Sequence, residues 1–337
     1  RTAFKEKDMD NITLYHAPVS YYSQKVRLYL LEKGLNFSEK VVDLVSRDNL
    51  KPDFLKINPK GEIPVLKHGE TFIPDSSKIF FYGEENLGGK DLFPEAKREE
   101  IKQMHNLIHS LPIEIVTYGC VMFPELMQDP IIPYFARRRL RNYVLNDVSQ
   151  NKIRKEMIGV SEDLLDAYEK KLELQDYKKK ILTSKAKIEE AISNVEDVLN
   201  VVEEHLEKMH KELQTTEPIF LFGNDITIAD IDLSILIGRL RFIGLEKRFL
   251  PQSTFNKKTN ELGDSPDDNI IRPYLRQYIA QIEKRPAFQN VVLSAYTYRM
   301  MMKLFAVSTF KQNENLFIGA GIFVAVAAIG LYFYKKM

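Results

Sequence analysis

Residues 61–66 read GEIPVL, and residues 74–79 follow with PDSSKI. Pro64 stands just before a short apolar run, so we predict a cis bond between Ile63 and Pro64 that leaves the backbone groups of Ile63 open to a ligand. In the second stretch, serine hydroxyls and free N–H groups begin a helix, whose positive end favours a bound anion. Taken singly, the two stretches also fit an ordinary turn and an ordinary helix cap.

A third stretch, residues 20–27 with the sequence SYYSQKVR, follows a strand pattern and begins a helix. The hydroxyls of Ser20 and Ser23 lie at this helix start, where they can donate to an anion. Apolar periodicity and turn residues around the three stretches predict further strands and helices. The predicted strands cover residues 12–15, 37–44, 63–66 and 71–73, and the predicted helices cover residues 23–33, 52–57 and 75–86. This order indicates a mixed sheet with helices packed on it, an α/β domain over residues 11–90.

Strand signals largely end after residue 94, and long helical periods replace them. We place a domain boundary near residues 88–95 and a helical domain at 95–303, with an inserted arm at about 137–187. The clearest helical period is a heptad stripe of apolar residues from Ile188 to Leu213. It fits either a coiled coil that recruits a partner or one long helix of an antiparallel bundle. We favour the bundle helix, because other long helices in the chain are available to cover the stripe.

The inserted arm is rich in basic residues, with arginines at positions 137–139 and 141 and lysines at positions 178–180. A polybasic segment near a bilayer binds anionic lipid headgroups, and the same charges could meet a protein partner. A solvated helix face is the simpler interpretation, and we favour it.

Overall charge and cysteine content narrow the function classes. The 337-residue chain is nearly neutral, with 48 Lys and Arg against 47 Asp and Glu, so no overall field favours nucleic acid. The single cysteine, Cys120, makes no internal disulfide, which suits a reducing compartment. His105 and His109 lie one helical turn apart, but position 106 is asparagine and no third ligand is evident, so we predict no metal site.

Residues 316–334 read LFIGAGIFVAVAAIGLYFY and contain no charged residue. As a helix, this run spans roughly 28 Å, close to the hydrocarbon thickness of a bilayer. Its last aromatic residues suit the headgroup level, and Lys335 and Lys336 can stay in water beyond it. We predict a single transmembrane tail anchor at 316–334, joined through a linker at 304–315 to a body on the cytosolic side.

In their order and spacing, the three N-terminal stretches resemble the glutathione transferase family. Residues 223–231 (GNDITIADI) resemble the helical-domain signature of that family, and physically they form a capping box with Thr227 and Asp230. The resemblance implies a thioredoxin-like N-terminal domain followed by the all-α C-terminal domain of a glutathione transferase.

The resemblance also implies a role for the first stretch. Ser20, with Ser23 as the alternative, stands where serine-type transferases keep the hydroxyl that stabilises the glutathione thiolate, which is the nucleophile. The chain departs from the family at Tyr21 and Tyr22, which are bulky where small residues often sit and would fill the pocket.

The other two stretches correspond to the part of the family's site that binds the tripeptide. Ile63, next to Pro64, would pair its backbone with the cysteinyl unit of glutathione, and Asp75 and Ser76 would meet the γ-glutamyl end. Transferases usually carry Glu or Gln before that serine, whereas Asp75 is shorter. We therefore expect weak or absent transferase activity, no required cofactor, and glutathione at most as a weak ligand.

A closer resemblance is to the ganglioside-induced differentiation-associated protein 1 family. It rests on SLP at residues 110–112, TYGC at 117–120, FPEL at 123–126 and IP at 132–133, together with the arm and the apolar tail. That family is glutathione-transferase-like, anchored by its tail in the outer mitochondrial membrane, and implicated in mitochondrial fission. The resemblance implies the same location, the outer mitochondrial membrane, with the body facing the cytosol. Peroxisomes are a second candidate location.

We therefore expect a regulator of mitochondrial dynamics that promotes fission and uses a transferase fold mainly as a binding scaffold. Two alternatives stay open. One is an active glutathione transferase displayed on the membrane, and the other is an adaptor that recruits partners through its long helices. A homodimer is compatible with each of them.

Overall fold

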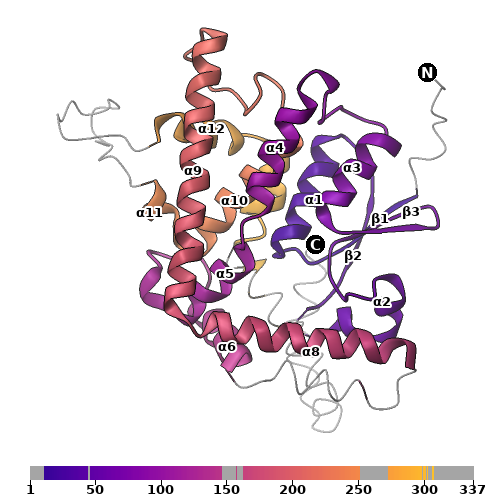
Figure 1. Ribbon diagram of the computed structural model, residues 1–337. Coiled ribbons are helices and arrows are strands. Elements are labelled where there is room, and N and C mark those ends of the chain that lie inside the picture. Colours follow the sequence, from indigo (N-terminus) through magenta and orange to yellow (C-terminus); the bar gives the residue numbers. More distant parts are fainter. Residues whose placement is uncertain are drawn as a thin grey trace.

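The structure, a computed structural model, describes residues 11–44, 46–145, 157, 162–250, 272–297, 299–300, 302 and 306. A four-stranded sheet with its helices is followed by a larger set of helices (Figure 1). The predicted tail anchor at 316–334 lies outside the described residues, as does the predicted linker except for position 306. No helix in the described part of the chain is both long enough and apolar enough to cross a membrane.

The first part of the chain has the predicted alternation of strands and helices. Its elements are β1 (Ile12–His16), α1 (Tyr21–Glu32), β2 (Ser38–Val41), η2 (Asp48–Leu50), α2 (Pro52–Ile57), β3 (Val65–His68), β4 (Thr71–Pro74) and α3 (Ser76–Asn86). The sheet order is β2-β1-β3-β4, with β1 and β2 parallel and the other neighbours antiparallel. This is the mixed sheet that the sequence predicts.

The two faces of the sheet are covered by different helices. Leu14 of β1 pairs with Leu66 of β3, and both are fully buried in the core that also holds apolar residues of α1 and α3. Val65, the neighbour of Leu66, belongs instead to a small cluster with Phe54 of α2 on the opposite face. This division follows from the alternation of side chains along a strand.

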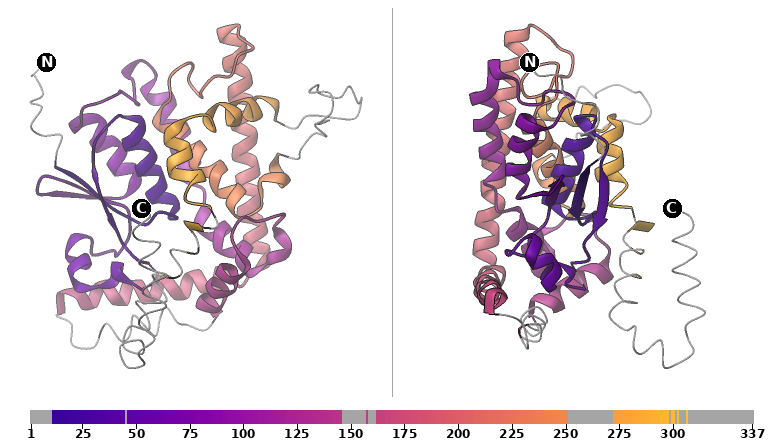
Figure 2. Two further views of the ribbon diagram at one scale, coloured as in Figure 1. Left: turned by 180° about the vertical axis from the view of Figure 1, so that it is seen from behind. Right: turned by 90° about the vertical axis from the view of Figure 1, so that its right-hand side faces the viewer.

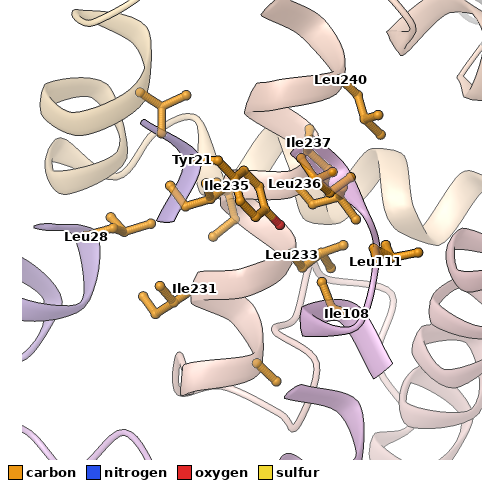
Figure 3. Packing of buried hydrophobic residues seen from close by; sticks show 14 of the residues in the cluster. Tyr21, Leu28, Ile108, Leu111, Ile231, Leu233, Ile235, Leu236, Ile237 and Leu240 are labelled. Carbon is orange, nitrogen blue, oxygen red and sulfur yellow. The ribbon is translucent and has the colours of Figure 1, made fainter. Parts of the chain in front are cut away.

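The rest of the described chain is helical. Its elements are η3 (Glu95–Lys97), α4 (Arg98–His109), α5 (Ile113–Met122), η4 (Pro124–Leu126), α6 (Tyr134–Leu145), α8 (Glu162–Leu182), α9 (Lys185–Leu213), α10 (Ile228–Phe242), α11 (Glu246–Phe249), α12 (Pro273–Ile282), α13 (Pro286–Phe288) and the π-helical turn η5 (Gln289–Leu293). Helix α10 is central, because it packs against both α1 and α4. Figure 3 shows the aliphatic side chains that it contributes to the core.

The apolar stripe predicted between Ile188 and Leu213 lies along α9. Every stripe residue up to Met209 is buried, and Leu213 at the end of the helix is 44% exposed. Helices α5, α8 and α12 of the same chain pack against α9. The bundle interpretation of the stripe is therefore confirmed. The coiled-coil interpretation is wrong, because three helices of the same chain cover the stripe and leave little of it for another chain.

Helix α8, which lies within the predicted arm, runs across one end of the molecule beside α2 (Figures 1 and 2). Tyr168 of α8 is fully buried and donates a hydrogen bond to the backbone carbonyl of Leu50. Lys178 pairs with Glu114 of α5 at 2.7 Å. This part of the arm therefore contacts the body at two points along α8, and the interpretation as a solvated basic face needs correction for this helix.

Candidate functional site

The turn between β1 and α1 holds both candidate serines. Ser20 is the N-cap of α1, and its Oγ accepts a hydrogen bond from the backbone N–H of Ser23 at 3.4 Å. Ser23 is fully buried, and its Oγ accepts from the N–H of Ala17 at 3.3 Å. The Ser23 hydroxyl thus holds the turn together, whereas half-buried Ser20 is the better placed of the two to meet a ligand.

The two tyrosines after Ser20 differ in their surroundings. Tyr21 is buried in the core between α1 and α10 (Figure 3), and burial raises its pKa well above the ordinary value. Tyr22 is half-buried, and burial raises its pKa to about 12. Both phenols therefore stay neutral near pH 7. The expectation that both residues fill the ligand pocket needs correction for Tyr21, which fills the core instead.

The peptide bond between Ile63 and Pro64 is cis, as the sequence predicts. Ile63 is half-buried and Pro64 is buried. Two buried amide side chains, Asn49 and Asn58, hold the preceding loop by donating to its backbone carbonyls at 2.7 and 2.8 Å. Sequence reasoning did not identify these asparagines, because asparagine is common in turns and nothing in their spacing points to the loop.

Asp75 and Ser76 stand at the start of α3, as predicted. Asp75 has a φ of 77° and caps the helix, because its carboxylate accepts from the N–H groups of Ser77 at 2.9 Å and Lys78 at 3.0 Å. Ser76 is 2% exposed. The helix end that the sequence assigns to an anionic ligand is therefore already occupied in part by a carboxylate of the chain itself.

Behind this helix end lies a buried cluster of polar side chains. Lys25 of α1 pairs with Asp232 of α10 at 2.7 Å, and neither side chain is exposed. The other carboxylate oxygen of Asp232 lies 2.5 Å from Nδ1 of His105, a fully buried residue of α4. Nε2 of His105 lies 2.5 Å from Oγ of Ser77. Burial opposes the charge on Asp232, but Lys25 and His105 overcome this and hold its pKa below the usual value.

The histidine pair of α4 is thus packed, as expected, but it is also part of this cluster. The rings of His105 and His109 stack with centroids 5.3 Å apart, and Nδ1 of His109 lies 3.4 Å from the Lys25 ammonium. Burial and the nearby ammonium lower the pKa of His109. Sequence reasoning missed Lys25 and Asp232. The available signal was the charge of Asp232 inside a helix whose other residues are mostly apolar.

Comparisons with known proteins agree with this architecture. A sequence profile of the glutathione S-transferase N-terminal domain matches residues 14–91. The chain is 29% identical to human ganglioside-induced differentiation-associated protein 1-like 1, over 96% of this chain and 86% of that protein. It is 26% identical to glutathione S-transferase TCHQD of Arabidopsis thaliana, over 83% and 88% of the two chains.

Solved structures support the fold. The β-etherase LigF from Sphingobium sp. strain SYK-6 superposes with a TM-score of 0.58 and 19% identity, covering 84% of this chain and 99% of that one. Ure2p in complex with S-hexylglutathione superposes with a TM-score of 0.55 and 17% identity, covering 84% and 99%. At such identities the likeness concerns the fold alone.

The sheet, the cis proline and the helical part define a glutathione-transferase-like protein with a thioredoxin-like N-terminal sheet and a helical C-terminal part. Within that class, the chain is similar over nearly its whole length to the ganglioside-induced differentiation-associated protein 1-like 1 proteins of human and mouse.

Proposed function

We propose that this chain is a tail-anchored regulator of mitochondrial network shape that uses its transferase fold mainly as a binding scaffold. Two features support the proposal. One is the similarity to a ganglioside-induced differentiation-associated protein over 96% of the chain. The other is the uncharged run at 316–334. A fold alone does not fix a function, so the argument against transferase catalysis depends on the site.

The cap at the start of α3 opposes the binding of glutathione, and so opposes transferase catalysis. The family resemblance assigns this helix end to the γ-glutamyl part of glutathione, which carries a carboxylate. In this chain the carboxylate of Asp75 already accepts from the N–H groups of Ser77 and Lys78. A second carboxylate there would meet like charge and would find these two donors in use. Glutathione is therefore a poor ligand.

We expect calorimetric titration of the full chain to give a glutathione Kd weaker than about 1 mM, equivalent to less than about 4 kcal/mol of binding free energy. Asp75→Asn should tighten binding roughly fivefold, about 1 kcal/mol, because Asn still caps a helix but carries no charge. Asp225→Asn is the matched control, since Asp225 is 80% exposed and pairs with Lys90, which follows the other end of α3 in the chain. It should leave binding unchanged.

Micromolar binding by the unaltered chain would overturn the scaffold proposal. So would turnover of an electrophilic substrate that disappears in Ser20→Ala, and either result would favour the membrane-displayed enzyme.

The membrane part of the proposal has its own test. We expect the full chain to sediment with mitochondria and to resist an alkaline wash, as integral membrane proteins do. Deleting residues 316–337 should move it to the soluble fraction, because this removes the uncharged run and its flanking lysines. Exchanging Lys335 and Lys336 for alanine is the control for lost charge alone and should leave the protein in the pellet. A truncated chain that resists the wash would contradict a tail anchor.

A further inference from the structure

Three side chains at the junction of α3, α4 and α10 form a continuous hydrogen-bonded chain. Oγ of Ser77 lies 2.5 Å from Nε2 of His105, and Nδ1 of the same ring lies 2.5 Å from Oδ2 of Asp232. A hydroxyl, an imidazole and a carboxylate in this order are the parts of an activated serine nucleophile. They come from residues far apart in sequence, so the fold brings them together.

The chemistry of the three groups fixes the direction of the hydrogen bonds. An ionised carboxylate only accepts, so Nδ1 of His105 carries a proton and donates to Asp232. In a neutral imidazole the other nitrogen then has a free lone pair, so Nε2 accepts from the Ser77 hydroxyl. This is the tautomer in which a histidine can remove the proton of a serine.

The Lys25 ammonium and the ring of His109 lie beside this hydrogen-bonded chain. The Lys25 ammonium pairs with Oδ1 of Asp232 at 2.7 Å, so the buried ion pair is already balanced. His109, stacked on the same ring, has a pKa lowered by burial and by Lys25 and adds no charge near neutral pH. At 2.5 Å from the Ser77 hydroxyl, Nε2 of His105 is placed to take its proton.

The solvent exposure of the three residues also suits a reactive serine. Asp232 and His105 are fully buried, whereas Ser77 is half-buried at the start of α3. An acyl group can therefore approach the Ser77 hydroxyl while His105 and Asp232 stay shielded from water. The positive end of α3 favours negative charge on the attacked carbonyl oxygen, although the Asp75 carboxylate at that end weakens the effect.

We propose that Ser77 is a nucleophile activated by His105, and that the chain accepts the acyl group of small carboxylic esters at this position. This activity is separate from the scaffold function and does not depend on it. Ser77 Oγ forms a bond to the acyl carbon while its proton moves to His105 Nε2. The ester C–O bond then breaks, and the leaving alcohol takes that proton. Water then attacks the acyl carbon while its proton moves to His105 Nε2. The bond between Ser77 Oγ and the acyl carbon breaks, Ser77 takes that proton, and the carboxylic acid leaves.

The test uses two probes on the full chain in detergent, an alkyl fluorophosphonate and p-nitrophenyl acetate. We expect the fluorophosphonate to attach at Ser77, located by peptide mass spectrometry, and the acetate to give a burst of one nitrophenolate per chain. Ser77→Ala and His105→Gln should each reduce the labelling rate at least about a hundredfold, the usual scale of base catalysis. Ser110→Ala is the matched control, since Ser110 is exposed, has its hydroxyl bonded to a backbone carbonyl of α4, and should leave labelling unchanged.

Ser77→Cys keeps a nucleophile of similar size, and we expect it to be acetylated by the ester in a folded protein. The proposal is overturned if the probe does not attach, if it attaches elsewhere, or if folded Ser77→Ala keeps the burst. Equal labelling of a folded His105→Gln variant would also overturn it, because the serine would then not depend on the histidine. Thermal unfolding of each variant shows which of them are folded.

Discussion

Asp232→Ala should destabilise the protein by about 3–5 kcal/mol, measured as the free energy of unfolding in urea. The carboxylate is fully buried and balances the equally buried Lys25 ammonium at 2.7 Å. Without it, the ammonium stays in the interior beside His109 and the faces of Tyr21 and Tyr22, none of which carries a negative charge near pH 7. Removing one partner of a buried ion pair therefore lowers the free energy of unfolding by far more than the intact pair contributes to it.

Asp225→Ala provides the matched control, because Asp225 also holds a lysine at 2.7 Å but is 80% exposed. Its loss should change stability by less than about 1 kcal/mol. The double variant Lys25→Met with Asp232→Leu should recover at least half of the lost stability, since a balanced apolar replacement leaves no buried charge. A small effect of Asp232→Ala, equal to that of Asp225→Ala, would show that water reaches Lys25.

Local patterns in the sequence predicted the order of the N-terminal elements well. The helix at residues 52–57 is found at the predicted positions, where Pro52 begins it. The predicted strand at 37–44 shortens to Ser38–Val41, because β2 is an edge strand and pairs only with the residues of β1 from Thr13 to His16. Edge strands are limited by their partner, and a single segment of sequence does not show where that partner ends.

The candidate site was predictable only where its residues lie close together in sequence. Asp75 and Ser76 were found from the PDSSKI stretch, but the sequence could not show that the Asp75 carboxylate turns back onto its own helix. The buried cluster could not be predicted at all. Lys25 resembles any lysine at the start of a helix, and its partner Asp232 lies 207 residues later, so only the packing of α1 on α10 brings them together.

The long helix α9 buries most of its apolar stripe inside the protein. Leu199 is 1% exposed and lies in the middle of the stripe that α5, α8 and α12 cover. Leu199→Asp places a carboxylate in apolar packing with no designed partner, so we expect a loss of more than about 4 kcal/mol in the free energy of unfolding. A domain at the low end of ordinary stability, about 5 kcal/mol, would keep about 1 kcal/mol or less and would be partly unfolded at 37 °C. Circular dichroism during heating and urea unfolding measure the effect.

Val201→Asp separates the effect of burial from that of a new charge on the helix, because Val201 lies on the same helix two residues away and is 44% exposed. It carries the same new charge, and Val and Asp have similar helix preferences, so it should cost less than about 1 kcal/mol. If Leu199→Asp stays as stable as Val201→Asp but loses a binding partner, the stripe is an interaction surface, and the adaptor function replaces the scaffold proposed for this helix. If only Leu199→Asp unfolds, α9 acts as a core helix, and partners must bind elsewhere on the molecule.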